Sequence, residues 1–329
     1  MPEHIPWSVA VPPEVYAEYC GVTMREYHAS PAAQMHVQLE GPRILHETYD
    51  LPLRRHLHPD FTTYLQTSVF GLRFEVFEDG IPAPTGHPIA SIEQAAELRV
   101  PEDIATAGLF AEALAFFDYM KTHAPKGVGV SFSSGGQAPW TAAVLLRGEG
   151  IFLDVVDHPD LVHRFLETIT ATAIRQREFC AQVSGTDPRA GAIGFGDDYG
   201  GLLGPEHFAE FDLRYMLRQA EHFGATTRNI HAELLRRPHL KLLQDAGWSY
   251  IDVGTDPHVT VRDCVEVLTI PFLVQMKSSQ ELLLATPEQI RATYRRMVAD
   301  GAQRMMVELC RGVPPENIRA FIAVAREFE

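Results

Sequence analysis

Short apolar runs alternate with longer amphipathic segments from Gly127 to the C-terminus. The apolar runs are continuous, which is typical of strands that are covered on both faces in a parallel sheet. The amphipathic segments carry apolar residues at helical spacing, and one of them opens with a capping box at Thr286–Gln289. This repeated order of strand and helix predicts an α/β fold. The predicted strands are Val128–Phe132, Ala192–Gly196, Asn229–Ala232, Tyr250–Val253, Phe272–Met276 and Arg304–Leu309.

A doubly wound sheet and a barrel both fit this order of elements. The alternating stretch Ser68–Glu78 supplies a further strand upstream, and the chain length suits an eight-stranded barrel with an extension. We therefore predict a (β/α)8 TIM barrel over residues 61–329. Residues 1–60 are predicted to be an N-terminal helical extension that packs on the barrel, with helices near Pro13–Tyr19 and Pro31–Glu40.

The composition is that of an ordinary globular protein, with 329 residues, 46% hydrophobic and 22% charged. The net charge of −15 argues against a nucleic-acid partner or an anionic membrane surface. The N-terminus lacks the pattern of a signal peptide, and no apolar run is long enough to span a membrane. The cysteines form no Cys-x-x-Cys pair and suggest no disulfide framework. We therefore expect a cytoplasmic protein.

In a parallel α/β barrel, the functional side chains lie where the strands end. His231 and Glu233 are two residues apart at the end of one predicted strand, so both can face the same pocket. Taken alone, this pair also fits a buried histidine beside a solvated glutamate. Cys310 follows another strand, and an imidazole, a carboxylate and a thiolate together suit a catalytic zinc ion with an open position. We predict that these three residues bind zinc.

Two adjacent carboxylates, Asp197 and Asp198, follow the strand Ala192–Gly196. Only one of them can face the pocket, where it would orient the substrate or handle a proton. The alternative is a structural turn before the two glycines that follow. Tyr199 and Lys277 also stand at strand ends and are predicted to bind substrate.

The segment His56-Leu57-His58 contains two histidines at a spacing that metal sites also use. Two arginines precede it and a Pro-Asp turn follows it. We interpret it as a surface loop with no strand beneath it.

Several motifs from about Phe70 to the C-terminus resemble those of the uroporphyrinogen decarboxylase superfamily. They are Glu78–Pro82, His87–Ile89, Gly196–Gly200, His231-x-Glu233, Cys310-x-Gly312 and Pro314–Asn317. The resemblance implies an (α/β)8 barrel. The arginine-rich N-terminal signature with which true decarboxylases grip porphyrinogen carboxylates is absent from this chain.

The chain is most similar to the zinc-dependent corrinoid methyltransferase branch, which includes methylcobamide:coenzyme M methyltransferases. In that branch His-x-Cys and a distant cysteine bind zinc, so His231 and Cys310 match two ligands and Glu233 replaces the third. Glu308 or Asp252 could supply a further ligand. The implied partners are a corrinoid protein and a small thiol or tetrahydrofolate, and a homodimer is compatible with this resemblance.

Two other functions stay open at this point. One is a cofactor-free decarboxylase of a uroporphyrinogen-like polycarboxylate, in which Asp197 or Asp198 stabilises a protonated pyrrole. The other is a non-catalytic barrel that binds a corrinoid or a metal.

Overall fold

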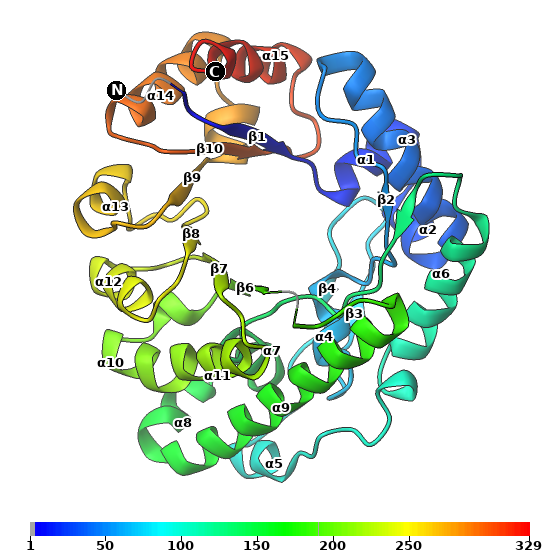
Figure 1. Ribbon diagram of the computed structural model, residues 1–329, viewed down its shortest axis with the longest axis vertical. Helices are drawn as coiled ribbons and strands as arrows, with labels where there is room; N and C mark the ends of the chain where they lie inside the picture. The colour runs from blue at the N-terminus through cyan, green and yellow to red at the C-terminus, as the bar shows by residue number, and fades with distance from the viewer. Residues whose placement is uncertain (1–3, 190) are drawn as a thin grey trace.

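The strands of this computed structural model lie around a common centre, and most helices lie outside them (Figure 1). The structure describes residues 4–189 and 191–329. Six parallel strands pair in the order β1-β10-β9-β8-β7-β6, and β2 pairs in parallel with β5. The predicted α/β fold with a parallel sheet, arranged as a TIM barrel, is confirmed. The strands are β1 (Trp7–Ala10), β2 (His56–Leu57), β5 (Gly129–Val130), β6 (Ala192–Asp197), β7 (Thr227–Ala232), β8 (Tyr250–Asp252), β9 (Phe272–Met276) and β10 (Met305–Glu308).

Many of the helices begin at a proline, whose fixed φ and missing N–H suit the first helical turn. The capping box predicted at Thr286 is present, with the Thr286 side chain accepting from the backbone N–H of Gln289. The helices are α1 (Pro13–Cys20), α2 (Met24–Ala29), α3 (Pro31–Tyr49), α4 (Leu65–Ser68), α5 (Ile92–Glu97), α6 (Phe110–His123), α7 (Pro139–Arg147), α8 (Ile151–Asp157), α9 (Pro159–Ser184), α10 (Pro205–Phe208), α11 (Arg214–His222), α12 (Arg237–Asp245), α13 (Val261–Val267), α14 (Pro287–Ala299) and α15 (Pro315–Arg326).

The N-terminal segment belongs to the barrel and is not only an extension. β1 pairs with β10 from Trp7 with Met305 to Ala10 with Glu308. β2 likewise pairs with β5. The predicted boundary at residue 60 is therefore wrong, although helices do occupy much of residues 1–60. β1 and β2 are too short to give a clear apolar run in the sequence.

The predicted strand Ser68–Glu78 is also wrong. Only Phe74–Glu75 is extended there, as β3, and it pairs antiparallel with β4 (Ala83–Pro84) in a separate hairpin. Side chains from Gly71 to Phe77 are mostly exposed or half-buried in alternation. That alternation is typical of a hairpin with one face in solvent, whereas a barrel strand is covered on both sides.

One large apolar core lies between the strands and the outer helices. β9 shows the packing most clearly, because four of its five residues are buried and Gln275 is half-buried. The two ends of the chain meet on this core, where Ile5 N donates to Phe328 O at 2.8 Å. In the part of the chain that the structure describes, none of the helices has the length and apolar content needed to cross a membrane.

Candidate functional site at the barrel mouth

His231 and Glu233 face the interior of the barrel mouth from the end of β7. Ala232, between them, is fully buried on the opposite face. The Nε2 atom of His231 lies 4.0 Å from Oε1 of Glu233, and both side chains are 36% exposed. The alternation of a strand thus brings the two predicted residues to one side, as expected from their spacing.

A carboxylate on the neighbouring strand orients His231. Asp252 of β8 is the register partner of His231, and its Oδ2 lies 3.1 Å from the His231 Nδ1. Asp252 in turn accepts from Gln275 Nε2 at 3.0 Å and from the backbone N–H of Gly254 at 2.9 Å. With Nδ1 held in this way, Nε2 is the ring nitrogen left for a ligand.

The electrostatic environment favours a proton on His231. Burial lowers the pKa of His231, but the hydrogen bond and charge of Asp252 raise it, as do the charges of Glu233 and Asp198, and the net result is a raised pKa. The same group of charges acts on Glu308 at the end of β10. Burial raises the pKa of Glu308, His231 lowers it, and Glu233 and Asp252 raise it further. His231, Glu233, Asp252 and Glu308 therefore form one electrostatic unit, and Asp198 also acts on His231.

Gly254 leaves just enough room for the pair. Its φ of +58° is left-handed, and a Cβ atom at this position would lie 2.6 Å from Glu233 Oε1 and 2.9 Å from His231 Cε1. Both distances are below any real Cβ contact, so a side chain here would have to displace the two functional groups.

We expect Gly254→Ala to impair ligand binding at the mouth at least tenfold and to destabilise the protein by about 1 kcal/mol, the usual cost of a left-handed alanine. Gly224→Ala is the matched control, since Gly224 has φ +60° and a Cβ atom added there would meet no other atom within 4 Å. Thermal unfolding and ligand titration of both variants check this. Equal binding losses in the two variants would contradict a specific role for the space at Gly254.

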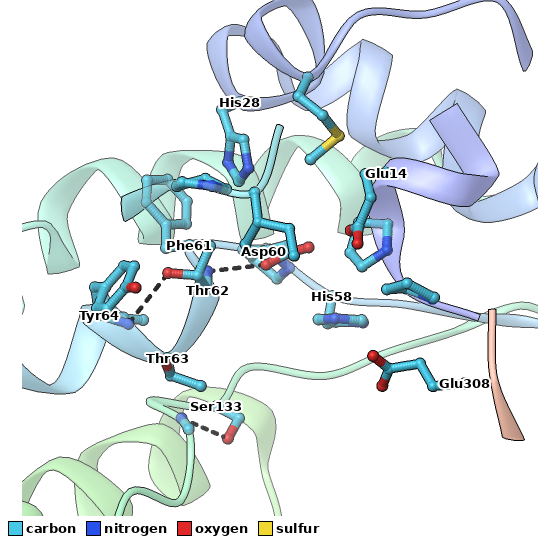
Figure 2. A pocket seen from close by; sticks show the side chains of 18 residues that line it. Glu14, His28, His58, Asp60, Phe61, Thr62, Thr63, Tyr64, Ser133 and Glu308 are labelled. Atoms are coloured by element: carbon cyan, nitrogen blue, oxygen red, sulfur yellow. Dashed lines mark hydrogen bonds between the residues drawn. The ribbon is translucent and has the colours of Figure 1, made fainter. Parts of the chain in front are cut away.

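A cavity of about 540 Å³ is lined by Glu308, the residue at the end of β10 on which the charge of His231 acts. Its walls come from the ends of β1, β2, β5 and β10, and Figure 2 shows Glu14, Asp60 and Glu308 around it. A volume of this size is typical of a pocket for a small organic molecule. His58 also lines it, so the segment His56-Leu57-His58 is not the surface loop that we expected. Leu57 is fully buried, and His56–Leu57 themselves form the strand β2, which pairs with β5.

The two adjacent aspartates point in different directions. Asp197 is fully buried, and its Oδ1 accepts from Thr141 Oγ1 at 3.0 Å and from Gly200 N at 2.9 Å. Asp198 is exposed, and its charge acts on His231 and on Tyr64, a residue of the cavity wall. Of the two predicted catalytic carboxylates, Asp198 is the one at the mouth. Tyr199 is half-buried beside it and also acts on Tyr64.

The other two predicted residues, Lys277 and Cys310, line hollows different from the cavity of about 540 Å³. Lys277 lines a different hollow, between the loops after β8 and β9 and the helices outside them. The Sγ atom of Cys310 approaches the carbonyl oxygen of Ser278 at 3.8 Å, and the residue lines a small hollow beside α1. Burial raises the pKa of the Cys310 thiol, and nearby carboxylates, Glu308 first, raise it further.

The predicted zinc ligands are therefore only partly assembled. Across residues 4–189 and 191–329, no three His, Cys, Asp or Glu side chains are grouped as metal ligands. The pair His231 and Glu233 fits a metal ion, because Asp252 holds Nδ1 in the way that outer carboxylates hold metal-binding histidines. Cys310 is not grouped with this pair.

Sequence reasoning missed Glu14, His28 and Asp60, which line the cavity. The sequence predicted Glu14 in a helix of the N-terminal extension, Pro13–Tyr19, and Asp60 in a Pro-Asp turn, so neither was expected at the barrel mouth. Only the pairing of β1 and β2 within the barrel places these residues at the mouth, and neither strand had been predicted.

Residues 2–328 match the uroporphyrinogen decarboxylase (URO-D) family. Among solved structures, the fold is similar to that of a methyltransferase from Methanosarcina mazei, with a TM-score of 0.73 and 18% identity over 99% of this chain and 94% of that one. A homocysteine methyltransferase from Escherichia coli is more distant, with a TM-score of 0.38 and 13% identity over 98% and 96% of the two chains. No curated protein sequence matches.

Proposed function

Because the chain belongs to the uroporphyrinogen decarboxylase family, we propose that it is a methyltransferase of that family. It would move a methyl group between a corrinoid on a partner protein and a thiol or folate acceptor. The observation that carries the proposal is the orientation of His231, whose Nδ1 is fixed by Asp252 while Nε2 faces Glu233 and the barrel mouth. The fold shared with a methyltransferase is compatible with it.

Transfer to a thiol forms a bond between sulfur and carbon and breaks the bond from the methyl group to the corrinoid, which keeps the electron pair. The thiol must also lose its proton. In our proposal His231 Nε2 and Glu233 hold zinc, which would supply the positive charge that lets a bound thiol ionise near neutral pH. Asp198, exposed at the mouth, is the proposed acceptor of the proton, and Tyr199 helps to hold the substrate.

The cavity lining supports this function over decarboxylation of a polycarboxylate. Within the described residues, no lysine or arginine lines the cavity, whereas Glu14, Asp60 and Glu308 do. A substrate with several carboxylates would meet like charges in a half-buried space, which is unfavourable.

Metal analysis tests the proposed ligands. We expect about one zinc per chain in the wild type and a loss of zinc in His231→Ala, because one protein ligand of a catalytic site would be removed. The zinc content of Cys310→Ala shows whether the Cys310 thiol binds zinc together with His231 and Glu233. Cys20→Ala, at another half-buried cysteine, is the matched control. A folded wild type that binds no zinc under any loading condition would contradict the metal part of the proposal.

A further inference from the structure

The chain turns away from β7 directly after Glu233, through an uncommon backbone conformation. Leu234 has a φ of +61°, in the left-handed region, which is strained for a bulky residue such as leucine. Its side chain is half-buried and belongs to none of the hydrophobic clusters of the described residues, so packing does not account for the conformation. Strained residues persist only where their surroundings fix them, and they cluster at functional sites.

The backbone before Leu234 is held in the conformation of a strand. The N–H of Glu233 donates to the carbonyl oxygen of Asp197 at 3.2 Å, which continues the pairing of β7 with β6 beyond Ala232. The loop after β6 lies directly against the peptide that joins Glu233 to Leu234, because a Cβ atom added to Gly201 would collide with the backbone of both residues. This close contact leaves the peptide no room to move toward β6.

A buried carboxylate from the next loop holds the backbone after Leu234. Asp256 lies in the loop after β8, and its Oδ2 accepts from the N–H of Leu235 at 2.6 Å. Its Oδ1 accepts from the N–H groups of His258 and Val259 at 2.6 and 3.2 Å. Hydrogen bonds to a charged acceptor are stronger than those between neutral groups. Asp256 thus ties the turn after β7 firmly to the loop after β8.

A buried histidine ties the same turn to the loop after β6. The Nδ1 atom of His239 accepts from the N–H of Arg236 at 3.0 Å, and its Nε2 lies 2.9 Å from the carbonyl oxygen of Leu203. Because a carbonyl oxygen can only accept, Nε2 carries the proton and donates it. The turn after β7 is therefore held by the loops on both sides of it.

We infer that Leu234 and Asp256 are positioning residues for Glu233. The left-handed turn lets the strand conformation continue through Glu233, so that its side chain points to the same side as that of His231, and Asp256 holds the turn in place. The carboxylate of Glu233 then lies 4.0 Å from His231 Nε2. This inference rests on the proposed function only for the metal ion, because the placement of Glu233 follows from the backbone itself.

Substitutions at Leu234 separate backbone conformation from packing. Valine is closer to leucine in size and polarity, but its β-branched side chain disfavours positive φ still more, whereas glycine adopts this conformation freely. We expect Leu234→Val to raise the Kd for zinc at least about tenfold, as the loss of outer partners of metal ligands does, and Leu234→Gly to stay within about threefold of the wild type. Competition with a chelator on the full-length protein measures the Kd. The opposite order would mean that the side chain only packs, and would overturn the inference.

Asp256→Asn gives a second test, which serves also if Leu234→Val does not fold. The amide replaces one acceptor oxygen by a donor that faces backbone N–H groups, so we expect a roughly tenfold higher Kd for zinc. Asp50→Val is the matched control, because Asp50 has a φ of +56° at the end of α3, where it pairs with Arg326 of α15. Its Kd should equal that of the wild type. An equal loss of zinc affinity in Asp50→Val would show a general effect of strain and overturn the inference.

Crystal structures of the metal-free proteins give a measurement that needs neither zinc nor turnover. The distance of 4.0 Å from His231 Nε2 to Glu233 Oε1 should be kept in Leu234→Gly and lengthened in Leu234→Val and Asp256→Asn. If the wild type binds no zinc but the distance changes in this way, the inference stands and the metal part of the proposed function is contradicted. If zinc binds equally well to the wild type and to every variant, and Glu233 keeps its place, the proposed function stands and the inference is overturned.

Discussion

Replacing His231 by alanine is expected to lower the rate of methyl transfer about a thousandfold, within the range observed when a central acid, base or ligand group is removed. His231 lies at the centre of the mouth, 3.1 Å from Asp252 through Nδ1 and 4.0 Å from Glu233 through Nε2. No neighbouring side chain can replace an imidazole in this position. The rate of methyl transfer from methylcobalamin to a thiol measures the effect.

Asp252→Asn gives a graded comparison. An amide can still fill the space but cannot hold the proton on Nδ1 as a carboxylate does, so we expect a loss of about 10- to 100-fold, as for other outer partners of functional histidines. His123→Ala, at the exposed end of α6, is the matched control and should leave the rate unchanged. A His231→Ala enzyme within a few-fold of the wild type would show that the reaction occurs elsewhere.

A buried pair of carboxyl groups is the second feature with a large expected effect. Asp197 at the end of β6 and Asp212, in a π-helical turn before α11, are both fully buried. A Cβ atom added to Gly200 would collide with the Oδ2 atoms of both, which shows that the two groups converge. Asp197 Oδ2 and both carboxyl oxygens of Asp212 are buried without a hydrogen-bond partner in the described residues, so a proton shared between the two groups would satisfy them.

The pair makes stability depend on pH. Burial and the charge of Asp197 raise the pKa of Asp212 well above its usual value. The folded state therefore keeps a proton that the unfolded chain releases near pH 4. The stabilisation is complete below that pH and falls by about 1.4 kcal/mol per pH unit as the pH rises toward the folded-state pKa.

Asp212→Asn removes this dependence, because an asparagine can donate to Asp197 but cannot ionise. We expect the free energy of unfolding of this variant, relative to the wild type, to rise with pH from about pH 4 at about 1.4 kcal/mol per unit. Urea unfolding between pH 5 and pH 8 measures the difference, with Asp118→Asn on the exposed face of α6 as the control. A constant difference over that range would mean that the two carboxyl groups share no proton.

The parts of the fold that could be predicted are those with a strong local pattern. β9 was predicted with its observed bounds, Phe272–Met276, because a buried five-residue run flanked by proline has one natural interpretation. β1 and β2 were missed because their four and two residues carry no such pattern. They become strands only through pairing with β10 and β5, which are far away in sequence.

In the site, too, local spacing predicts some features, while others depend on the pairing of strands that are distant in sequence. His231 and Glu233 could be placed together because a strand turns alternate residues to one side. The contact of His231 with Asp252 depends on the register between β7 and β8, which no local spacing encodes. Cys310 shows the limit of reasoning from strand ends. It follows β10 as expected, but the chain turns its thiol toward the Ser278 carbonyl instead of the pair.

The most direct test of the proposed methyl transfer is a single-turnover assay of the purified protein with methylcobalamin and 2-mercaptoethanol. We expect loss of the methylcobalamin absorbance together with formation of the S-methyl product, and we expect neither change in His231→Ala. If no thiol or tetrahydrofolate accepts the methyl group, while a polycarboxylate incubated with the protein releases carbon dioxide, the proposed methyl transfer would be contradicted.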